Sequence, residues 1–301
     1  MIPAKFDVKL VLCLVIVAIV WGTTYLGISI AVHEIPAWYV AGSRQVIAAS
    51  ILGIYLWYKG MLAWKGWTYT GRQILLSLLM IVIANGMTTY AEKSIPSGLT
   101  SLLNALSPLL VFIGSVFLGM QKATIRSIFG ILLGFLGVAF IFRDGLTDLL
   151  NPAYRIGLLC IGIAISGWSI GTLVVKKNFN KFKSDSVLSD LFYQFTFAAI
   201  FQLILALIFD PIPAIHNWSL KSILAVFYLG IFGSVIGYFC YHYALKRVSA
   251  IQVSILSYVN TIIALFLGWL ILAEKLSYDL IIATILILLG VFLTNYKKRN
   301  V

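Results

Sequence analysis

A single arginine, Arg44, stands well inside a long apolar run of this 301-residue sequence. A charged side chain in hydrocarbon is costly unless it is partnered, so its presence there indicates a purpose. One interpretation is a cation that meets the carboxylate of a bound solute. The other is a structural arginine that binds helix-end carbonyls or extends its head group toward the interface. The sequence leaves both interpretations open.

His242 is a second titratable group within an apolar run, flanked by Tyr241 and Tyr243. A histidine in this position could take up a proton near neutral pH. A histidine among aromatic side chains can equally be a packing group. Both interpretations again stay open.

Neutral polar and aromatic side chains recur in the same apolar runs. The strongest candidates for a cavity are Asn85, Asn104 and Asn260, because an amide needs several hydrogen-bond partners and a water-filled cavity supplies them. Amides and hydroxyls can also join neighbouring helices. Together these groups predict a substrate-binding set that consists of Trp21, Thr24, Tyr25, Arg44, Asn85, Thr88, Thr89, Ser101, Asn104, Trp168, Thr172, Tyr238, His242, Tyr258 and Asn260.

The sequence lacks the residue patterns that several kinds of chemistry require. Acidic residues stand only at the edges of the apolar runs, among them Glu92 and Glu274, so a buried carboxylate relay for protons has no support and downhill transport is favoured. No phosphate-binding loop, metal-ligand cluster or nucleophile–base pattern is present. All three cysteines lie in apolar runs, which argues against disulfides and zinc. The sequence therefore predicts no cofactor and no enzymatic activity.

The elements that hold these residues are membrane spans. Apolar residues make up 61% of the chain and charged residues 11%, against about 25% charged in soluble proteins, and the mean hydropathy is +1.01. So apolar a chain lacks the polar surface of a nucleic-acid binder. Runs of about 20 residues can cross the hydrocarbon layer as helices. Ten runs qualify, at residues 9–32, 36–58, 72–91, 97–118, 125–142, 155–175, 187–209, 219–243, 248–272 and 278–296.

The basic residues predict an orientation. The net charge is +12, and 16 of the 22 Lys and Arg residues fall on the side of the N-terminus in the ten-span map. Basic residues accumulate on the cytosolic side of membrane proteins. We therefore expect both termini in the cytosol and the protein in the cell inner (plasma) membrane.

A weak internal repeat divides the chain into two units, at residues 1–145 and 146–301. Tyr90–Ile95 aligns with Tyr243–Val248, and Gly137-Val138 aligns with Gly290-Val291. Each unit holds five spans, and five is odd, so the second unit enters the membrane inverted. Inverted repeats are typical of transporters. Chance similarity between apolar helices is the alternative.

On these residues the chain resembles the drug/metabolite transporter superfamily, of the EamA type. The resemblance rests on Trp21-Gly22, Arg44, Tyr90-Ala91, Tyr243-Ala244-Leu245 and Ala273-Glu274-Lys275. It implies an all-α polytopic membrane protein with ten transmembrane helices in two inverted five-helix EamA repeats around a substrate cavity. One departure is visible after the fourth span, where Met120-Gln121 replaces the usual Gly-Glu. This departure puts a symmetric pair of loop carboxylates in doubt.

The sequence as a whole predicts an alternating-access transporter that exports small metabolites or amino-acid-like solutes. Its expected partners are a small-molecule substrate and the lipid bilayer, without nucleic acid, and the expected state is a monomer or homodimer. Two alternatives stay open. One is a membrane-embedded enzyme that acts on lipid-like substrates, and the other is a channel.

Overall fold

The computed structural model describes residues 7–120, 122–141, 152–178, 186–213, 215–248, 250–254 and 256–295. Within these ranges the regular structure is helical, and each of the ten predicted spans coincides with a helix or a chain of helices. Seven of the helical stretches are long and apolar enough to cross a membrane, and three shorter apolar helices accompany them. The predicted all-α polytopic fold is confirmed.

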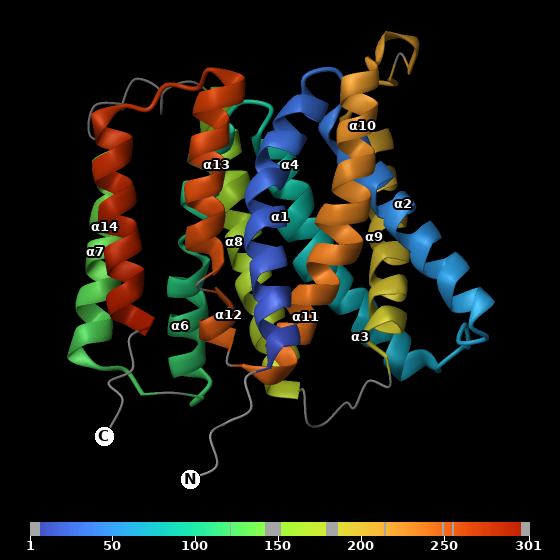
Figure 1. The fold of residues 1–301 in the computed structure, drawn as a ribbon, viewed down its shortest axis with the longest axis horizontal. Coiled ribbons are helices and arrows are strands. Elements are labelled where there is room, and N and C mark those ends of the chain that lie inside the picture. The colour runs from blue at the N-terminus through green and yellow to red at the C-terminus, as the bar shows by residue number, and fades with distance from the viewer. Residues whose placement is uncertain are drawn as a thin grey trace.

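The helical elements follow one another up and down through the molecule (Figure 1). Their bounds are α1 Val8–Val32, α2 Ala37–Tyr58, α3 Trp67–Ser77, η1 Leu78–Gly86, α4 Met87–Ala91, α5 Ser97–Asn104, α6 Ser107–Phe117, α7 Ile125–Ile141, α8 Pro152–Asn178, α9 Val187–Phe209, η3 Ile215–Asn217, α10 Leu220–Tyr228, η4 Leu229–Ile236, α11 Gly237–Arg247, α12 Ala250–Ser254, α13 Leu256–Leu272 and α14 Tyr278–Asn295.

Two spans contain a π-helical segment at their centre. The third span runs α3–η1–α4 and the eighth runs α10–η4–α11, so each half of the chain carries one such segment. A π-helical turn widens the helix and re-aims the side chains that follow it, and such turns are frequent at functional sites. Nothing in the apolar pattern of these spans had predicted them.

The fourth span is interrupted just before Pro108. Helix α5 ends at Asn104, and α6 begins at Ser107 with Pro108 in its first turn. The backbone N–H groups of the first helical turn have no partner within the helix, so a proline, which has no N–H, is tolerated there. The interruption leaves Asn104 and Ser107 beside irregular backbone in the middle of the span.

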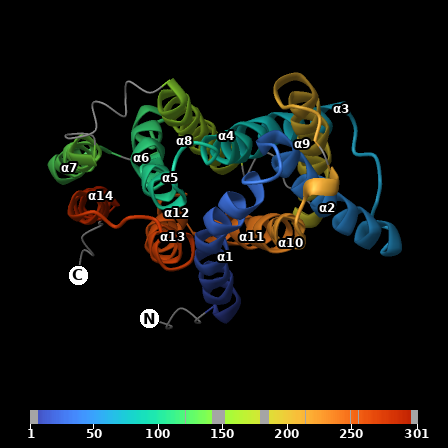
Figure 2. The same ribbon diagram turned by 90° about the horizontal axis from the view of Figure 1, so that it is seen from above.

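The two halves of the chain interlock rather than lie side by side. Viewed from above, α7 and α14 form a pair at one edge, and α2 and α9 pack together near the opposite edge (Figure 2). Helix α1 contacts α13 and α11, both from the second half. Both termini emerge from the same end of the bundle (Figure 1).

Close helix approach depends on small residues. A Cβ atom built on Gly290 of α14 would lie 2.5 Å from the Gly130 carbonyl oxygen and 2.5 Å from the Gly134 backbone nitrogen of α7. No side chain fits between these two backbones. A side chain at this crossing would force the α7 and α14 backbones apart.

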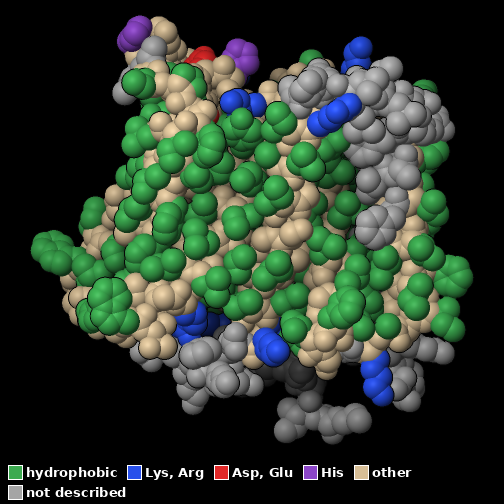
Figure 3. Space-filling view, turned by 180° about the vertical axis from the view of Figure 1, so that it is seen from behind, with side chains coloured by type: hydrophobic (Ala, Val, Ile, Leu, Met, Phe, Trp, Pro, Cys, Tyr) green, Lys and Arg blue, Asp and Glu red, His purple; other side chains and the backbone are tan. Residues whose placement is uncertain are grey.

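The outer surface suits lipid. Hydrophobic side chains cover the face between the two ends of the molecule, and Lys and Arg side chains gather at the ends (Figure 3). Large apolar side chains point outward from many helices, for example Ile54, Leu207 and Phe292. An apolar band with charged rims is what a hydrocarbon layer requires.

Candidate functional site

Four aromatic side chains meet at the centre of the bundle. The Trp21 ring of α1 makes an edge-on contact with Trp168 of α8, with 5.3 Å between ring centroids, and lies 5.1 Å from Tyr241 of α11. Tyr238, also on α11, lies 5.5 Å from Trp21. The Trp21 Nε1–H donates to the Gly233 carbonyl oxygen at 3.0 Å, and Tyr238 donates to the Met80 carbonyl at 2.9 Å. Both bonds end on π-helical segments, which fix the aromatic cluster in place.

The cluster forms one wall of a central cavity of about 120 Å³. This volume can hold several water molecules. Ten of the lining residues come from positions 21–107 and nine from positions 164–260, so the two halves contribute almost equally. The lining consists of Trp21, Thr24, Tyr25, Ile28, Arg44, Ala84, Asn85, Thr88, Asn104, Ser107, Ala164, Trp168, Tyr238, Tyr241, Val253, Ser254, Leu256, Ser257 and Asn260.

The polar lining is partly tied to neighbouring helices. Tyr25 hydrogen-bonds with the side chain of Asn104, whose amide also donates to the Thr100 carbonyl at 3.1 Å. Asn85 accepts from the Gln45 amide at 3.4 Å. With its amide turned to suit both neighbours, Asn260 donates to the carbonyls of Ala18 and Leu256, each at 2.9 Å. Each asparagine thus holds helices together while it faces the cavity, so the two interpretations of these residues do not exclude each other.

Arg44 is the cation of this cavity and is almost completely buried, with 1% of its surface exposed. Its Nε–H donates to the Ser234 hydroxyl at 3.2 Å, across the interface between α2 and η4. Its Nη1 has no hydrogen-bond partner among the described residues. The guanidinium is therefore held through its Nε, while its Nη1 is left without a hydrogen-bond partner among the described residues.

Three carboxylates connect the halves at the end of the bundle opposite the termini. Glu34 accepts from the Ser219 backbone N–H at 2.7 Å, and this bond lowers the pKa of its carboxyl group. Asp210 accepts from the Trp38 backbone N–H at 2.6 Å. Glu274 accepts from Ser97 and Gly98, as described below. Each carboxylate lies in one half of the chain and caps a helix N-terminus of the other, where backbone N–H groups lack partners and negative charge is favoured.

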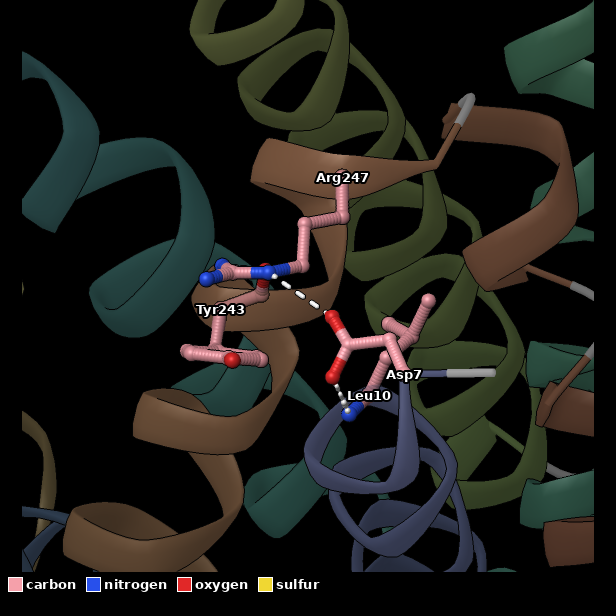
Figure 4. A network of polar contacts seen from close by, with 4 residues as sticks. All are labelled: Asp7, Leu10, Tyr243 and Arg247. Atoms are coloured by element: carbon pink, nitrogen blue, oxygen red, sulfur yellow. Dashed lines mark hydrogen bonds and ion pairs between the residues drawn. The ribbon is translucent and has the colours of Figure 1, made fainter. Parts of the chain in front are cut away.

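Polar contacts also join the halves at the end that holds the N-terminus. There Arg247 of α11 forms an ion pair with Asp7 at 3.3 Å, and its guanidinium lies over the Tyr243 ring (Figure 4). Asp7 in turn caps α1 by accepting from the Leu10 N–H at 3.1 Å. The ion pair is about 40% exposed on both sides, and such exposed pairs contribute little stability. At the same end Tyr69 and Gln73 of α3 donate to the Asp190 carboxylate of α9 at 2.7 and 3.0 Å, so part-buried hydrogen bonds between the halves also hold this end.

The structure brings ten of the fifteen predicted site residues to the cavity lining and leaves five elsewhere. Thr89 and Ser101 are fully buried in their own helices' packing, and Thr172 hydrogen-bonds with the Tyr241 hydroxyl at 2.9 Å behind the aromatic wall. His242 is buried against the Tyr241 ring, and Tyr258 packs in an apolar cluster around Leu109. These five residues do not line the cavity in this conformation.

Sequence reasoning missed several lining residues for which a signal existed. Ile28, Ala84 and Ala164 lie three or four positions from predicted lining residues, on the same helix face. Tyr241 follows Tyr238 by one turn. Extending each predicted polar position by helical spacing would have found them. Val253, Ser254, Leu256 and Ser257 form a similar stripe that leads to Asn260.

The described residues offer no group of three or more His, Cys, Asp or Glu side chains that could hold a metal ion. The cavity has one cation, several amides and hydroxyls, and an aromatic wall. This lining can bind a small solute that carries both polar and apolar parts, and it has no nucleophile paired with a base.

The chain is similar to known transporters over nearly its whole length. The family model described as EamA-like transporter family matches residues 8–143 and 155–296. The chain is 25% identical over 296 residues to the "Uncharacterized transporter YoaV" of Bacillus subtilis, covering 98% of this chain and all of that protein. It is 27% identical over 287 residues to the "Uncharacterized inner membrane transporter YedA" of Escherichia coli K12, covering 93% and 90%.

Two further similarities extend over nearly the whole chain. The "Protein PagO" of Salmonella typhimurium is 28% identical over 300 residues, covering 97% of this chain and 94% of that protein. A protein of known crystal structure superposes with a TM-score of 0.68 at 20% identity, covering 95% of this chain and 96% of the other. At that identity the superposition shows a shared fold.

Proposed function

Because the chain belongs to the EamA-like transporter family, we propose that it exports small amphiphilic zwitterions, of the amino-acid type, across the cell inner membrane by alternating access. That it is a multi-pass membrane transporter follows from the family and the apolar spans. The direction, the substrate class and the mechanism are the proposal.

The central cavity carries this proposal. A carboxylate needs a cation, and Arg44 lines the cavity with an Nη1 that has no hydrogen-bond partner among the described residues. An apolar side chain needs an apolar wall, and the cluster of Trp21, Trp168, Tyr238 and Tyr241 supplies one. Amides at Asn85 and Asn104 suit the remaining polar groups. Small-molecule sites generally have this composition, an apolar lining with few polar anchors.

The arrangement of the spans supports alternating access. With repeats at residues 1–145 and 146–301, equivalent spans pack against each other, since α2 contacts α9 and α7 contacts α14. A two-fold axis in the membrane plane produces such pairs wherever it passes between a helix and its own copy. The family model matches the chain twice, once in each half. Rocking of one repeat against the other would then open the cavity to either side.

Rocking must break cross-half contacts at one end while those at the other end hold. The three carboxylate caps of Glu34, Asp210 and Glu274 lie at one end and the Asp7–Arg247 pair at the other. With the basic residues as the orientation signal, the carboxylate end faces outward and both termini are cytosolic. Cysteine labelling of intact cells at each end tests this orientation.

Counterflow in proteoliposomes tests the transport function. Vesicles preloaded with an unlabelled L-amino acid should accumulate the labelled one, and the rate should saturate with concentration. Trp168→Ala and Asn104→Ala should lower this rate by about tenfold, the effect of about 1.4 kcal/mol of lost binding. Trp269→Ala is the matched control, because Trp269 is half exposed on the outside of α13 and should leave the rate unchanged.

The competing functions give different results in the same vesicles. A channel neither saturates nor shows counterflow, and an enzyme acting on lipid-like substrates changes the lipid rather than moving the solute. Unchanged rates in both Trp168→Ala and Asn104→Ala, with folded protein, would contradict the cavity assignment.

A further inference from the structure

Glu92 lies on the helix face that lines the cavity. It directly follows α4, and its backbone N–H donates to the Thr88 carbonyl at 3.2 Å. Asn85 and Thr88 line the cavity, and residues four apart on a helix share one face. Glu92 therefore continues the Asn85–Thr88 stripe by one turn toward the carboxylate end. Only 7% of its surface is exposed.

Its carboxyl group differs from the others at that end. Glu34, Asp210 and Glu274 each accept a backbone N–H, whereas neither oxygen of Glu92 has a hydrogen-bond partner among the described residues. Burial of an ionised carboxylate without a partner costs several kcal/mol, so the group is stable only when it holds a proton or binds a cation. The Glu92 carboxyl group is thus a hydrogen-bond acceptor without a described donor, one helical turn from the cavity lining.

Two charged side chains act on Glu92. Arg44 on α2 and Glu274 after α13 act on it electrostatically, and its own charge acts on Tyr25 of α1. Burial raises the pKa of the Glu92 carboxyl group well above its usual range, the negative charge of Glu274 raises it further, and the positive charge of Arg44 opposes this.

The other described neighbours named by their contacts are apolar or already paired. On the α8 side, Cys160 and Tyr154 pack in the apolar cluster around Ala91. The adjacent Lys93 lies over the Tyr90 ring and pairs with Asp210 at 3.9 Å. Arg44 is the cation that acts on Glu92, and the two do not approach to ion-pair distance.

Arg44 in the cavity lining and Glu92, one helical turn beyond the lining residue Thr88, thus form a separated pair of opposite charges, and each has a polar atom without a hydrogen-bond partner among the described residues. We propose that they are the two ends of a zwitterion site, in which Arg44 binds the solute carboxylate and Glu92 binds its ammonium group, and that a proton competes with the ammonium for Glu92. The inference rests on the proposed function and deepens it, since it replaces the expectation of uncoupled transport with exchange of solute for protons.

The exchange balances in atoms and charge. The neutral Glu92 carboxylic acid releases its proton to water, and the resulting carboxylate pairs with the ammonium of the entering solute. When the solute leaves, the carboxylate takes up a proton again. An inward proton gradient would therefore drive the solute outward, in agreement with export.

Three probes of matched shape test the site on the full-length protein in lipid nanodiscs: L-phenylalanine, 3-phenylpropionate, which lacks the ammonium, and phenethylamine, which lacks the carboxylate. We expect the wild type to bind phenylalanine about tenfold more tightly than either analogue. We expect its affinity to fall as the pH falls, with release of a proton on binding, measured by calorimetry in buffers of different ionisation enthalpy. Glu92→Gln should bind phenylalanine and phenylpropionate within about twofold of each other, independently of pH. Glu34→Gln, at the same end but exposed, should behave as the wild type.

Equal binding of phenylalanine and phenylpropionate to the wild type would overturn this inference and leave a carboxylate transporter standing. Binding of none of the probes, with no counterflow of any amino acid, would overturn the proposed substrate class as well. If Glu92→Gln does not fold, the wild-type pH dependence decides alone between about pH 6 and 8, where the carboxylates of both probes stay ionised. In this range protonation of Glu92 weakens phenylalanine binding and does not weaken phenylpropionate binding, which needs no ammonium partner.

Discussion

Removal of the Glu274 carboxylate should measurably destabilise the carboxylate end of the bundle. Its Oε1 accepts from the Ser97 backbone N–H and from the Ser97 hydroxyl, both at 2.7 Å, and its Oε2 accepts from the Gly98 N–H at 2.9 Å. These donors belong to the first residues of α5, which have no partners within the helix. Glu274→Ala deletes all three bonds at once.

The magnitude follows from the number and kind of bonds. A hydrogen bond to a charged group contributes about 1.5–3 kcal/mol, but one carboxylate shared among three donors is not additive, and loss of a helix cap costs about 0.5–2 kcal/mol. Glu274 is half-buried, so water can replace part of the loss. We expect the free energy of unfolding to fall by about 2–3 kcal/mol.

Reversible denaturant unfolding in lipid micelles, followed by tryptophan fluorescence, measures this loss. Ser97→Ala alone removes one hydroxyl donor and should cost about 1 kcal/mol. In the Glu274→Ala background the same change should cost almost nothing, because the hydroxyl has already lost its acceptor. A loss below about 0.5 kcal/mol for Glu274→Ala, the range of neutral surface changes, would refute the reasoning.

Three further predictions concern stability. Ala273 has a φ of 55°, a left-handed conformation that costs a non-glycine residue about 1–2 kcal/mol, so Ala273→Gly should stabilise the protein by about 0.5–1 kcal/mol in the same unfolding assay. Gly290→Ala should destabilise by about 1–3 kcal/mol through the clash with α7, whereas Gly162→Ala, with open space around its Cβ, should stabilise by about 0.5–1 kcal/mol; equal effects would contradict the close-packing argument. Burial raises the pKa of Glu92 above its usual value of about 4.5, so the folded protein holds this proton more tightly than the unfolded chain does. The free energy of unfolding of the wild type should therefore fall as the pH rises above about 4.5. Unfolding curves of Glu92→Gln across the same range should lack this slope.

The sequence predicted much of the site for a physical reason. Polar side chains inside a span are too costly to occur without a partner, so their mere presence selects candidates. Asn85, Asn104 and Arg44 were found in this way, and all three line the cavity. Thr172 and His242 satisfied the same criterion and lie elsewhere, because burial against a neighbouring helix and burial against a cavity give the same pattern in one chain.

Glu92 shows where position along the chain misleads. It stands at the edge of its span, where a carboxylate is expected to meet water, and this place argued against a buried carboxylate. The neighbouring helices cover it instead, so that its exposed surface falls to 7%. The depth of a residue at a span edge depends on what packs around it, which the sequence of that span does not contain.

The sequence by itself determined the ten spans and the fold class, because a hydrocarbon layer of fixed thickness demands apolar helices of a minimum length and leaves no other way to satisfy their backbones. Only the tertiary structure decided which polar residues share a space. The π-helical segments reorient the side chains that follow them, and the glycine crossing of α7 with α14 depends on contact between spans distant in the chain. The meeting of Arg44 and the aromatic wall at one cavity is therefore a property of the assembled bundle.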